Sequence, residues 1–168
     1  MDAQRAIGFR PIQADDAERL VGAFERLSAR SRYRRFLAPV NALSETEVRQ
    51  FTEVDFVDHV AWVAELVCEP GRPFAGVGRW IRSRADPAVA ELALTVVDAY
   101  QRQGLGTALL KLLAEAALQR GVQWFEGTVL GENQPMRALL YAYGAVQVGY
   151  DMGAYVLRVR VASVAGTL

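Results

Sequence analysis

The fold is decided by residues 96–107, which read Val96-Val97-Asp98-Ala99-Tyr100-Gln101-Arg102-Gln103-Gly104-Leu105-Gly106-Thr107. An apolar strand, residues 89–97, runs into this glycine-containing loop, and a helical pattern of apolar residues follows it as far as Arg120. The first N–H groups of a helix have no partners within it, and the helix dipole places partial positive charge there. Glycine at 104 and 106 lets the main chain approach phosphate oxygens closely. The stretch therefore predicts a diphosphate-binding loop.

Two better-known phosphate loops are excluded by the same residues. The dinucleotide-binding pattern needs a third glycine where this chain has Leu109, and the Walker motif needs a Gly-Lys-Ser/Thr sequence that is absent. Gln101 and Arg102 would add side-chain donors to the loop. A plain strand-to-helix turn, with glycine used only for tightness, stays open on these residues alone.

The rest of the chain alternates strand and helix patterns around this loop. Strands are expected at residues 7–12, 59–67, 74–81, 89–97, 122–130, 146–150 and 155–161. Helices are expected at residues 15–28, 44–52, 106–120 and 133–144. The hairpins are antiparallel and the β-α-β passages need parallel neighbours, so the sequence predicts an α/β fold with a mixed sheet.

Composition bounds the class of protein. The chain has 168 residues, of which 52% are apolar, and its 19 basic residues balance 19 acidic ones. This predicts a single domain over residues 1–168, with residues 162–168 as a flexible tail, and no nucleic-acid or membrane partner. No run approaches the roughly 18 apolar residues that a membrane span needs, so a cytoplasmic protein is expected. Whether it is a monomer or a homodimer stays open.

Cysteine and histidine are too few for a metal site. One cysteine, Cys68, and one histidine, His59, exclude an internal disulfide and a metal cluster built on these residue types. Cys68 is expected to be a buried thiol. His59 follows Asp58 at a strand start, where a structural role is favoured over a catalytic one.

Two motifs at matching separation resemble a known family. Residues 101–106 match the pyrophosphate loop Gln/Arg-x-x-Gly-x-Gly/Ala, and Asn133 opens the next helix while Gly144 closes it. With the element order, the chain resembles the GNAT superfamily of acyl-CoA-dependent N-acyltransferases over nearly its whole length. The resemblance implies a mixed, largely antiparallel sheet of seven strands with a splayed parallel pair, flanked by four helices. It also implies acetyl-CoA as cosubstrate and no metal.

Other segments narrow the resemblance. Residues 31–36, 54–62 and 133–137 look like the acetyltransferase domain of bacterial protein-lysine acetyltransferases. Residues 90–96 resemble the strand that carries the catalytic glutamate of those enzymes, and Glu91 takes its position. Members of that group often carry a second, regulatory domain, for which 168 residues leave no room.

The resemblance assigns a binding role to two groups of residues. The main chain of the strand before the loop should bind the pantetheine and the thioester carbonyl, and the loop should bind the pyrophosphate. Asn133 either contacts the cofactor or only caps its helix. The cofactor-binding residues expected are Leu94, Thr95, Val96, Gln101, Arg102, Gln103, Gly104, Leu105, Gly106, Thr107 and Asn133.

Glu91 is the expected general base. A free lysine has a pKa near 10.4 and is protonated at neutral pH, so a carboxylate within reach must take its proton before the nitrogen attacks. A lone carboxylate in an apolar strand is costly to bury unless it is paired or used. The alternative is that Glu91 points to solvent. Two other strand carboxylates, Glu65 and Glu126, are expected at edges, at the surface or in ion pairs.

Two features leave alternatives open. Many family members have a tyrosine that protonates the departing thiolate where this chain has Leu140, and Tyr141 lies one residue later. With a thiol pKa near 8.5, the thiolate can also leave unassisted. An arginine-rich segment could hold the 3′-phosphate of CoA, face an acidic acceptor or form a solvated helix end; it contains Arg26, Arg30, Arg32, Arg34 and Arg35.

The expected function is therefore acetyl-CoA-dependent N-acetyl transfer to a primary amine, with a protein lysine as the preferred acceptor. One alternative is a small-molecule amine acetyltransferase. The other is a non-catalytic sensor module that binds acyl-CoA without turnover.

Overall fold

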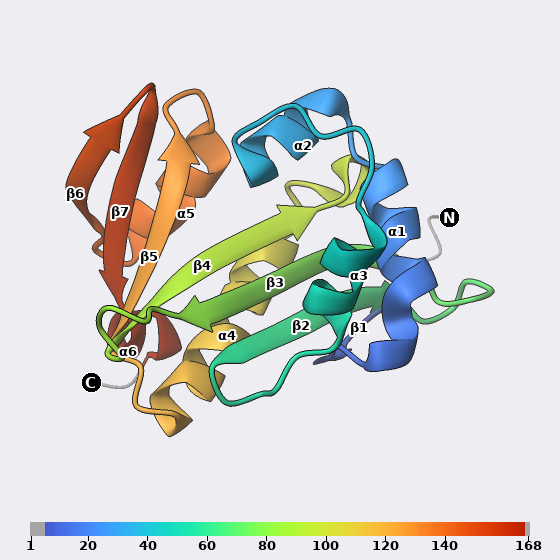
Figure 1. Cartoon of the computed structure of the whole chain (residues 1–168), viewed down its shortest axis with the longest axis horizontal. Helices are drawn as coiled ribbons and strands as arrows, with labels where there is room; N and C mark the ends of the chain where they lie inside the picture. The colour runs from blue at the N-terminus through green and yellow to red at the C-terminus, as the bar shows by residue number, and fades with distance from the viewer. Residues whose placement is uncertain (1–5, 167–168) are drawn as a thin grey trace.

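The structure is a computed structural model that describes residues 6–166, and its centre is one seven-stranded mixed sheet (Figure 1). The strand order is β1-β2-β3-β4-β5-β7-β6, in which only β4 and β5 pair in parallel. The strands are β1 (Ile7–Pro11), β2 (His59–Leu66), β3 (Phe74–Arg82), β4 (Val89–Val96), β5 (Trp124–Leu130), β6 (Val146–Asp151) and β7 (Ala154–Arg160). The mixed α/β sheet that the sequence predicts is confirmed.

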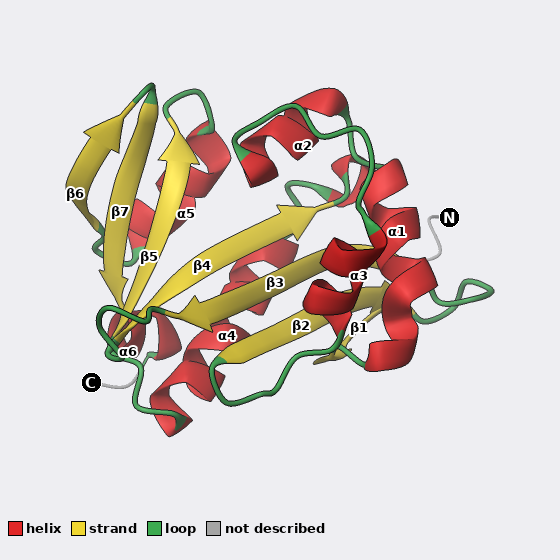
Figure 2. Ribbon diagram, viewed as in Figure 1, coloured by secondary structure: helices red, strands yellow, loops and turns green. Residues whose placement is uncertain are grey.

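Helices cover both faces of this sheet (Figure 2). Helices α1 to α3 lie over one face of strands β1 to β4, whereas α4 and α5 pack on the opposite face. The α-helices are α1 (Ala17–Glu25), α2 (Ala29–Phe36), α3 (Glu45–Thr52), α4 (Leu105–Gln119), α5 (Gln134–Ala142) and α6 (Val161–Ala165), with short 3-10 turns η1 (Ala14–Asp16) and η2 (Asp98–Tyr100).

The sequence analysis missed helix α2. Its sequence, ARSRYRRF, has Ala29, Tyr33 and Phe36 on one face, but this stripe is short and four arginines make the segment polar overall. The helix is instead set by its ends, because the Ser28 hydroxyl accepts a hydrogen bond from the Ser31 amide at 3.1 Å, and Leu37 ends it in the left-handed conformation at φ 57°. A cap at each end thus stabilises a helix whose residues resemble those of a charged loop.

Two further expectations need correction. Part of the C-terminal segment expected as a flexible tail forms α6, where Val164 is buried in the core; residues 167–168 lie outside the described range. Cys68 is exposed rather than buried, because it lies in the turn after β2. Within residues 6–166, no helix has the length and apolarity to cross a membrane, and no cluster of candidate metal ligands occurs.

Helix α4 packs closely against the sheet because β3 carries glycine beneath it. A Cβ at Gly78 would stand 2.8 Å from side-chain carbons of both Leu113 and Leu94. The Trp80 indole is fully buried alongside and donates a hydrogen bond from Nε1 to the Leu113 carbonyl at 3.1 Å. This contact fixes α4, and hence the loop before it, against the centre of the sheet.

Strands β4 and β5 part after a short parallel contact (Figure 1). They pair only from Val89–Trp124 to Glu91–Glu126, and beyond Glu91 the two strands share no ladder. The Val97 N–H bonds to Ala75 on β3, so alternation along the strand directs the main-chain groups of Val96 and Leu94 into the opening. The splayed pair expected from the resemblance is confirmed.

A buried ion cluster ties β1 to the first helices. Asp16 is fully buried and accepts two hydrogen bonds from the Arg10 guanidinium, each at 2.8 Å. Arg19 and the Gln13 amide donate to the same carboxylate at 3.1 and 2.8 Å. Burial alone would raise the pKa of Asp16, but the bonds and charges of these partners hold it below its ordinary value. Asp16 is therefore a charged anchor of the fold.

Candidate active site

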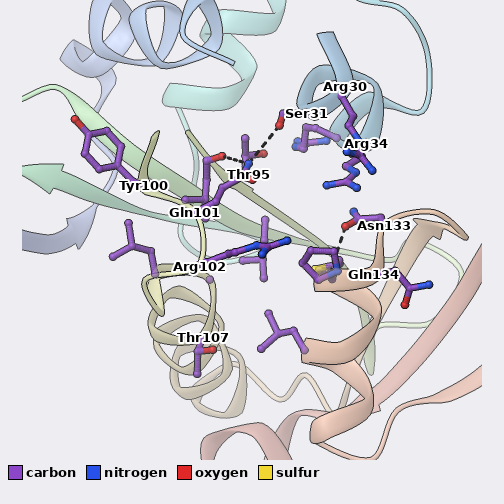
Figure 3. A pocket seen from close by; sticks show the side chains of 18 of the residues that line it. Arg30, Ser31, Arg34, Thr95, Tyr100, Gln101, Arg102, Thr107, Asn133 and Gln134 are labelled. Atoms are coloured by element: carbon purple, nitrogen blue, oxygen red, sulfur yellow. Dashed lines mark hydrogen bonds between the residues drawn. The ribbon is translucent and has the colours of Figure 1, made fainter. Parts of the chain in front are cut away.

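A cavity of about 550 Å³ lies beside the opening between β4 and β5 (Figure 3). Its walls come from α2, the end of β4, the loop before α4, the first turn of α4 and the start of α5. The cavity thus brings together segments from residue 30 to residue 139. The cavity extends from the part of β4 that no longer pairs with β5 to the N-terminus of α4.

Helix α4 begins without a side-chain cap. Ser28, Ser44 and Asn133 accept a hydrogen bond from the first turn of α2, α3 and α5, whereas no side chain does so for α4. Gly104, at φ 82°, precedes the helix, and a Cβ there would meet no atom within 4 Å. The first-turn N–H groups and the positive end of the dipole therefore face the cavity, which makes this terminus suited to an anion.

A negative charge at Gly104 should weaken acetyl-CoA binding by about 100-fold, since charges at such sites act over a few ångströms in a partly desolvated cavity. The variant is Gly104→Asp, because aspartate tolerates a left-handed backbone better than most residues. Gly121→Asp is the matched control: it has φ 74°, equally open space, and lies at the other end of α4. Calorimetric titration of both variants checks the effect. Equal affinities in the two variants would contradict it.

The loop residue Gln101 lines the cavity, and its side chain is held by two acceptors of the protein. Its Nε2 donates to the Val96 carbonyl at 3.0 Å and to the Ser31 hydroxyl at 3.3 Å, so its amide ties β4 to α2 (Figure 3). Asp98 strengthens the same junction, because it accepts hydrogen bonds from the Ser28 amide and from the hydroxyls of Ser28 and Ser31. Arg102, at φ 62°, points into the cavity instead.

Two arginines of α2 reach an acid from the loop before α5. Arg34 and Arg30 lie 2.8 and 3.0 Å from the Glu132 carboxylate, and all three line the cavity. The hydrogen bond from Arg34 is the main reason that the pKa of Glu132 falls to about 2. Of the three interpretations of the arginine-rich segment, the solvated helix end fits Arg30, which is largely exposed, better than Arg34, which is mostly buried.

The other arginines of that segment divide between support and cavity. Arg26 donates to the Phe74 carbonyl at 2.6 Å and Arg32 to the Phe24 carbonyl at 3.2 Å, so both stabilise the end of α1. Arg35 lines the cavity.

Most of the residues predicted to bind the cofactor line the cavity. They are Leu94, Thr95, Val96, Gln101, Arg102, Gly104, Leu105, Gly106, Thr107 and Asn133. Gln103 is the exception, since it does not line the cavity. Its side-chain amide donates to the Ala99 carbonyl at 3.4 Å. Asn133 is confirmed as a cap, because its side chain accepts from the Met136 amide at 3.3 Å.

The sequence analysis did not assign several lining residues. Ser31, Tyr100, Glu132, Gln134, Pro135, Met136 and Leu139 also contribute to the wall. Pro135, two residues after Asn133, was a usable signal, since the residues of a helix's first turn surround whatever binds at that end.

Glu91 lies on β4 before the strands part, and its side chain is exposed. Alternation places it on the same face as Ala93 and Thr95, opposite α4. No described residue forms a hydrogen bond or ion pair with its carboxylate. Glu126, its register partner on β5, is held by Arg158 at 2.7 Å. Glu91 thus lies beside the opening without a hydrogen-bonding partner among the described residues, and its charge acts on Arg35 of α2.

Glu65 and the two candidate positions for a general acid lie outside the cavity. Glu65 is buried and pairs with Arg10 at 3.2 Å, as expected of an ion-pair partner. Leu140 is 1% exposed in the core, whereas Tyr141 is exposed and does not line the cavity. The geometry gives Tyr141 no access to a leaving group bound there.

His59 contacts a buried arginine of β3. Its Nε2 lies 2.9 Å from Nη1 of Arg79, and a guanidinium can only donate, so the imidazole accepts as the neutral ring. Burial, followed by the charge of Arg79, lowers the pKa of His59 to about 4. This contact supports the structural role that the sequence favours.

The His59 contact should make stability depend on pH. The unfolded imidazole takes up a proton below pH 6.5, whereas the folded one resists protonation until about pH 4. Stability is therefore full above pH 6.5 and falls as the pH drops towards 4, by about 1–2 kcal/mol after screening of the partly exposed ring. His59→Gln keeps an acceptor but does not titrate. Urea unfolding of both proteins at pH 7 and pH 4.5 checks this, and an equal pH response would contradict it.

The chain is similar in sequence to known acetyltransferases. A family profile for the acetyltransferase (GNAT) domain matches residues 6–146. Acetyltransferase Pat of Mycolicibacterium smegmatis is 35% identical over 155 residues, covering 90% of this chain and 45% of Pat. Acetyltransferase PA5475 of Pseudomonas aeruginosa is 31% identical over 147 residues, covering 87% of this chain and 78% of that protein. The chain thus spans less than half the length of the mycobacterial relative.

Solved structures agree with the sequence relatives. The GNAT domain of Streptomyces lividans PAT superposes with a TM-score of 0.82 at 36% identity, covering 90% of this chain and 89% of that domain. The yncA structure from Salmonella typhimurium, solved with its cofactor acetyl-CoA, superposes with a TM-score of 0.70 at 16% identity, covering 93% of this chain and 94% of that one. At that identity the second likeness shows the fold alone.

Proposed function

Because the chain belongs to the GNAT family of acetyltransferases, we propose that it transfers an acetyl group from acetyl-CoA to a primary amine, preferably a protein lysine. The observation that carries the proposal is the cavity that joins the uncapped N-terminus of α4 to the opened strand β4. A single ligand with a diphosphate at one end and a thioester at the other matches both parts.

The residues present suit acetyl-CoA, which supplies an acetyl group activated as a thioester. The N–H groups of Leu105, Gly106 and Thr107 are positioned to bind the diphosphate, since no side chain caps them. Arg102 from the loop and the two arginines of α2 add positive charge to the same cavity. The main chain of Leu94 and Val96 is directed into the opening, where an N–H can stabilise negative charge on the thioester oxygen.

Glu91 supplies the base in this proposal. Its carboxylate, directly or through one water, takes the proton of the ammonium. The neutral nitrogen then forms a bond to the thioester carbonyl carbon, and the carbon–sulfur bond breaks to release the thiolate. The nitrogen is cationic after the attack and gives its second proton to the thiolate or to water, which leaves a neutral amide. The thiolate leaves without a protein acid, which fits the core position of Leu140 and the exposed position of Tyr141.

The choice of a protein lysine rests on relatives. Segments 31–36, 54–62 and 133–137 resemble bacterial protein-lysine acetyltransferases, and the chain is 35% identical to the acetyltransferase named Pat. A cytoplasmic location is proposed on the same basis. A small-molecule amine and a sensor without turnover are the alternatives that the experiment must separate.

Labelled acetyl-CoA separates these functions. The protein is incubated with labelled acetyl-CoA and a bacterial lysate, and label is counted in the macromolecular and small-molecule fractions against a reaction without the protein. Base-stable label located on lysines by mass spectrometry supports protein acetylation. Label only in the small-molecule fraction would move the assignment to amines. Label in neither fraction, with acetyl-CoA binding intact, would identify a sensor.

A further inference from the structure

Arg79 is a buried cation without a counter-charge. It lies in the middle of β3 and is 4% exposed, yet within residues 6–166 no carboxylate oxygen lies within 4.0 Å of it. Nη1 donates to the Phe51 carbonyl at 3.0 Å and contacts His59, and the guanidinium lies over the Phe51 ring at 4.6 Å. Neither Nε nor Nη2 has a hydrogen-bond acceptor in the described part of the chain.

Arg35 of α2 is a second cation without a hydrogen-bonded counter-charge among the described residues, and it is partly buried. Its guanidinium lies over the rings of Phe36 and Phe51, at 4.8 and 5.7 Å, and forms no hydrogen bond or ion pair with any described residue. Burial lowers the pKa of Arg35, and the charge of Glu91 opposes that effect. Burial and the charge of Arg35 in turn lower the pKa of Arg79 to about 9. The two guanidiniums are therefore close enough to repel each other.

A small cavity adjoins these arginines. It measures about 40 Å³, and its wall is apolar apart from Arg35, Arg79 and Thr95 of β4. Arg35 and Thr95 also line the large cavity, so the two spaces adjoin. A water molecule occupies about 30 Å³ in the liquid, so the small cavity suits a group of carboxylate size.

Two partly desolvated cations beside each other are unfavourable unless an anion joins them. Other partly buried arginines of the described chain have acceptors for their charge: Arg10 and Arg158 have carboxylate partners at 2.8 and 2.7 Å, and Arg120 donates to two main-chain carbonyls. Arg35 and Arg79 lie together beside the opening, on the face of the sheet that carries Glu91, with one main-chain acceptor between them. Unpaired donors that converge at a reaction centre are typical of a substrate-binding site.

We propose that Arg35 and Arg79 form a carboxylate-binding subsite that accepts an acidic group of a substrate during acyl transfer. The subsite rests on the proposed function, because it adjoins the place where the amine and the thioester meet. The carboxylate has two chemical sources. It belongs to the amine acceptor, or it ends a dicarboxylic acyl group such as succinyl.

Two kinetic arms distinguish the sources. In the first, acetyl-CoA is the donor, and Nα-acetyl-lysine is compared with its methylamide, which lacks the carboxylate. In the second, the methylamide is the acceptor, and succinyl-CoA is compared with butyryl-CoA, which has the same chain length without the charge. One arm is expected to show a preference of at least about tenfold in kcat/KM for the carboxylate, the discrimination of one charge-assisted hydrogen-bonded pair. Arg35→Gln and Arg79→Gln should abolish that preference.

A binding arm needs no turnover. Acetate and glutarate are titrated into the protein while the guanidinium Nε–Hε signals of Arg35 and Arg79 are followed by NMR. Wild type should show saturable shifts that Arg35→Gln weakens at least about tenfold. Arg35 tolerates substitution best because it holds no main-chain acceptor. Arg49→Gln is the matched control, since it removes the same charge from the exposed face of α3.

The outcomes are separable. Turnover without a carboxylate preference in either arm, and no shift at the two arginines, would overturn the subsite while the proposed function stands. Shifts at both arginines without turnover of any substrate would support the subsite and overturn the proposed function. A preference that survives both arginine variants, or that Arg49→Gln removes equally, would also overturn the subsite.

Discussion

Replacing Glu91 with glutamine is expected to slow acetyl transfer at pH 7 by about 10²–10⁴-fold, the usual contribution of a general base. Affinity for acetyl-CoA should be unchanged, because Glu91 does not line the cavity that would hold the diphosphate. The loss should shrink as the pH rises towards the amine pKa near 10.4, since solvent then removes the proton that Glu91 would take. Steady-state rates from pH 7 to pH 10, with calorimetric titration of acetyl-CoA, measure both effects.

Glu126→Gln is the control for this substitution. Glu126 is the register partner of Glu91 on β5, but Arg158 holds its carboxylate at 2.7 Å. It should therefore keep turnover within about threefold of wild type. A large loss in Glu126→Gln with little loss in Glu91→Gln would transfer the base to β5. An equal loss of acetyl-CoA affinity and of rate in Glu91→Gln would give Glu91 a binding role instead.

Asp16→Asn is expected to destabilise the fold by about 3–5 kcal/mol, because removing one partner of a buried ion pair leaves uncompensated charge. Asp16 is fully buried, and its charge balances Arg10 and Arg19 at 2.8 and 3.1 Å. The melting temperature should fall by about 10 °C or more at this chain length. Thermal and urea unfolding at pH 7 provide the measurement.

The neighbouring acid separates burial from charge. Asp15 is exposed in the same 3-10 turn, and Asp15→Asn removes the same charge from the same segment. It should change stability by less than about 0.5 kcal/mol. Similar effects of the two substitutions would show that the buried cluster contributes no more than a surface charge.

The sequence carries enough information for the sheet because its strands are bounded by turns and end where the period changes. Residues 96–107 place the loop and the start of α4 in advance, since strand, glycine and helical stripe occur in immediate succession. Helix α2 was missed because its apolar stripe is only three residues long among four arginines, and its caps depend on Ser28 and Leu37 adopting particular backbone angles.

The missing helix explains what the site prediction lacked. Without α2, nothing brings Arg35 from the N-terminal third of the chain to Arg79 on β3, or Arg34 to Glu132. Periodicity also cannot show that Gln101 turns back onto Val96, or that Gln103 faces away from the cavity. These are tertiary contacts, set by which side chain finds an acceptor after the elements have packed.

The parting of β4 from β5 gives the sheet an internal edge. An edge strand at the surface offers its row of main-chain groups to any other chain and is prone to aggregation. Here the edge lies between α2 and α5 and borders the cavity. A polypeptide strand needs neighbours about 4.8 Å away on both sides and room for side chains, whereas a thin, flexible amide chain needs neither. The fold thus keeps the hydrogen-bonding capacity of a strand edge while limiting by width what can use it.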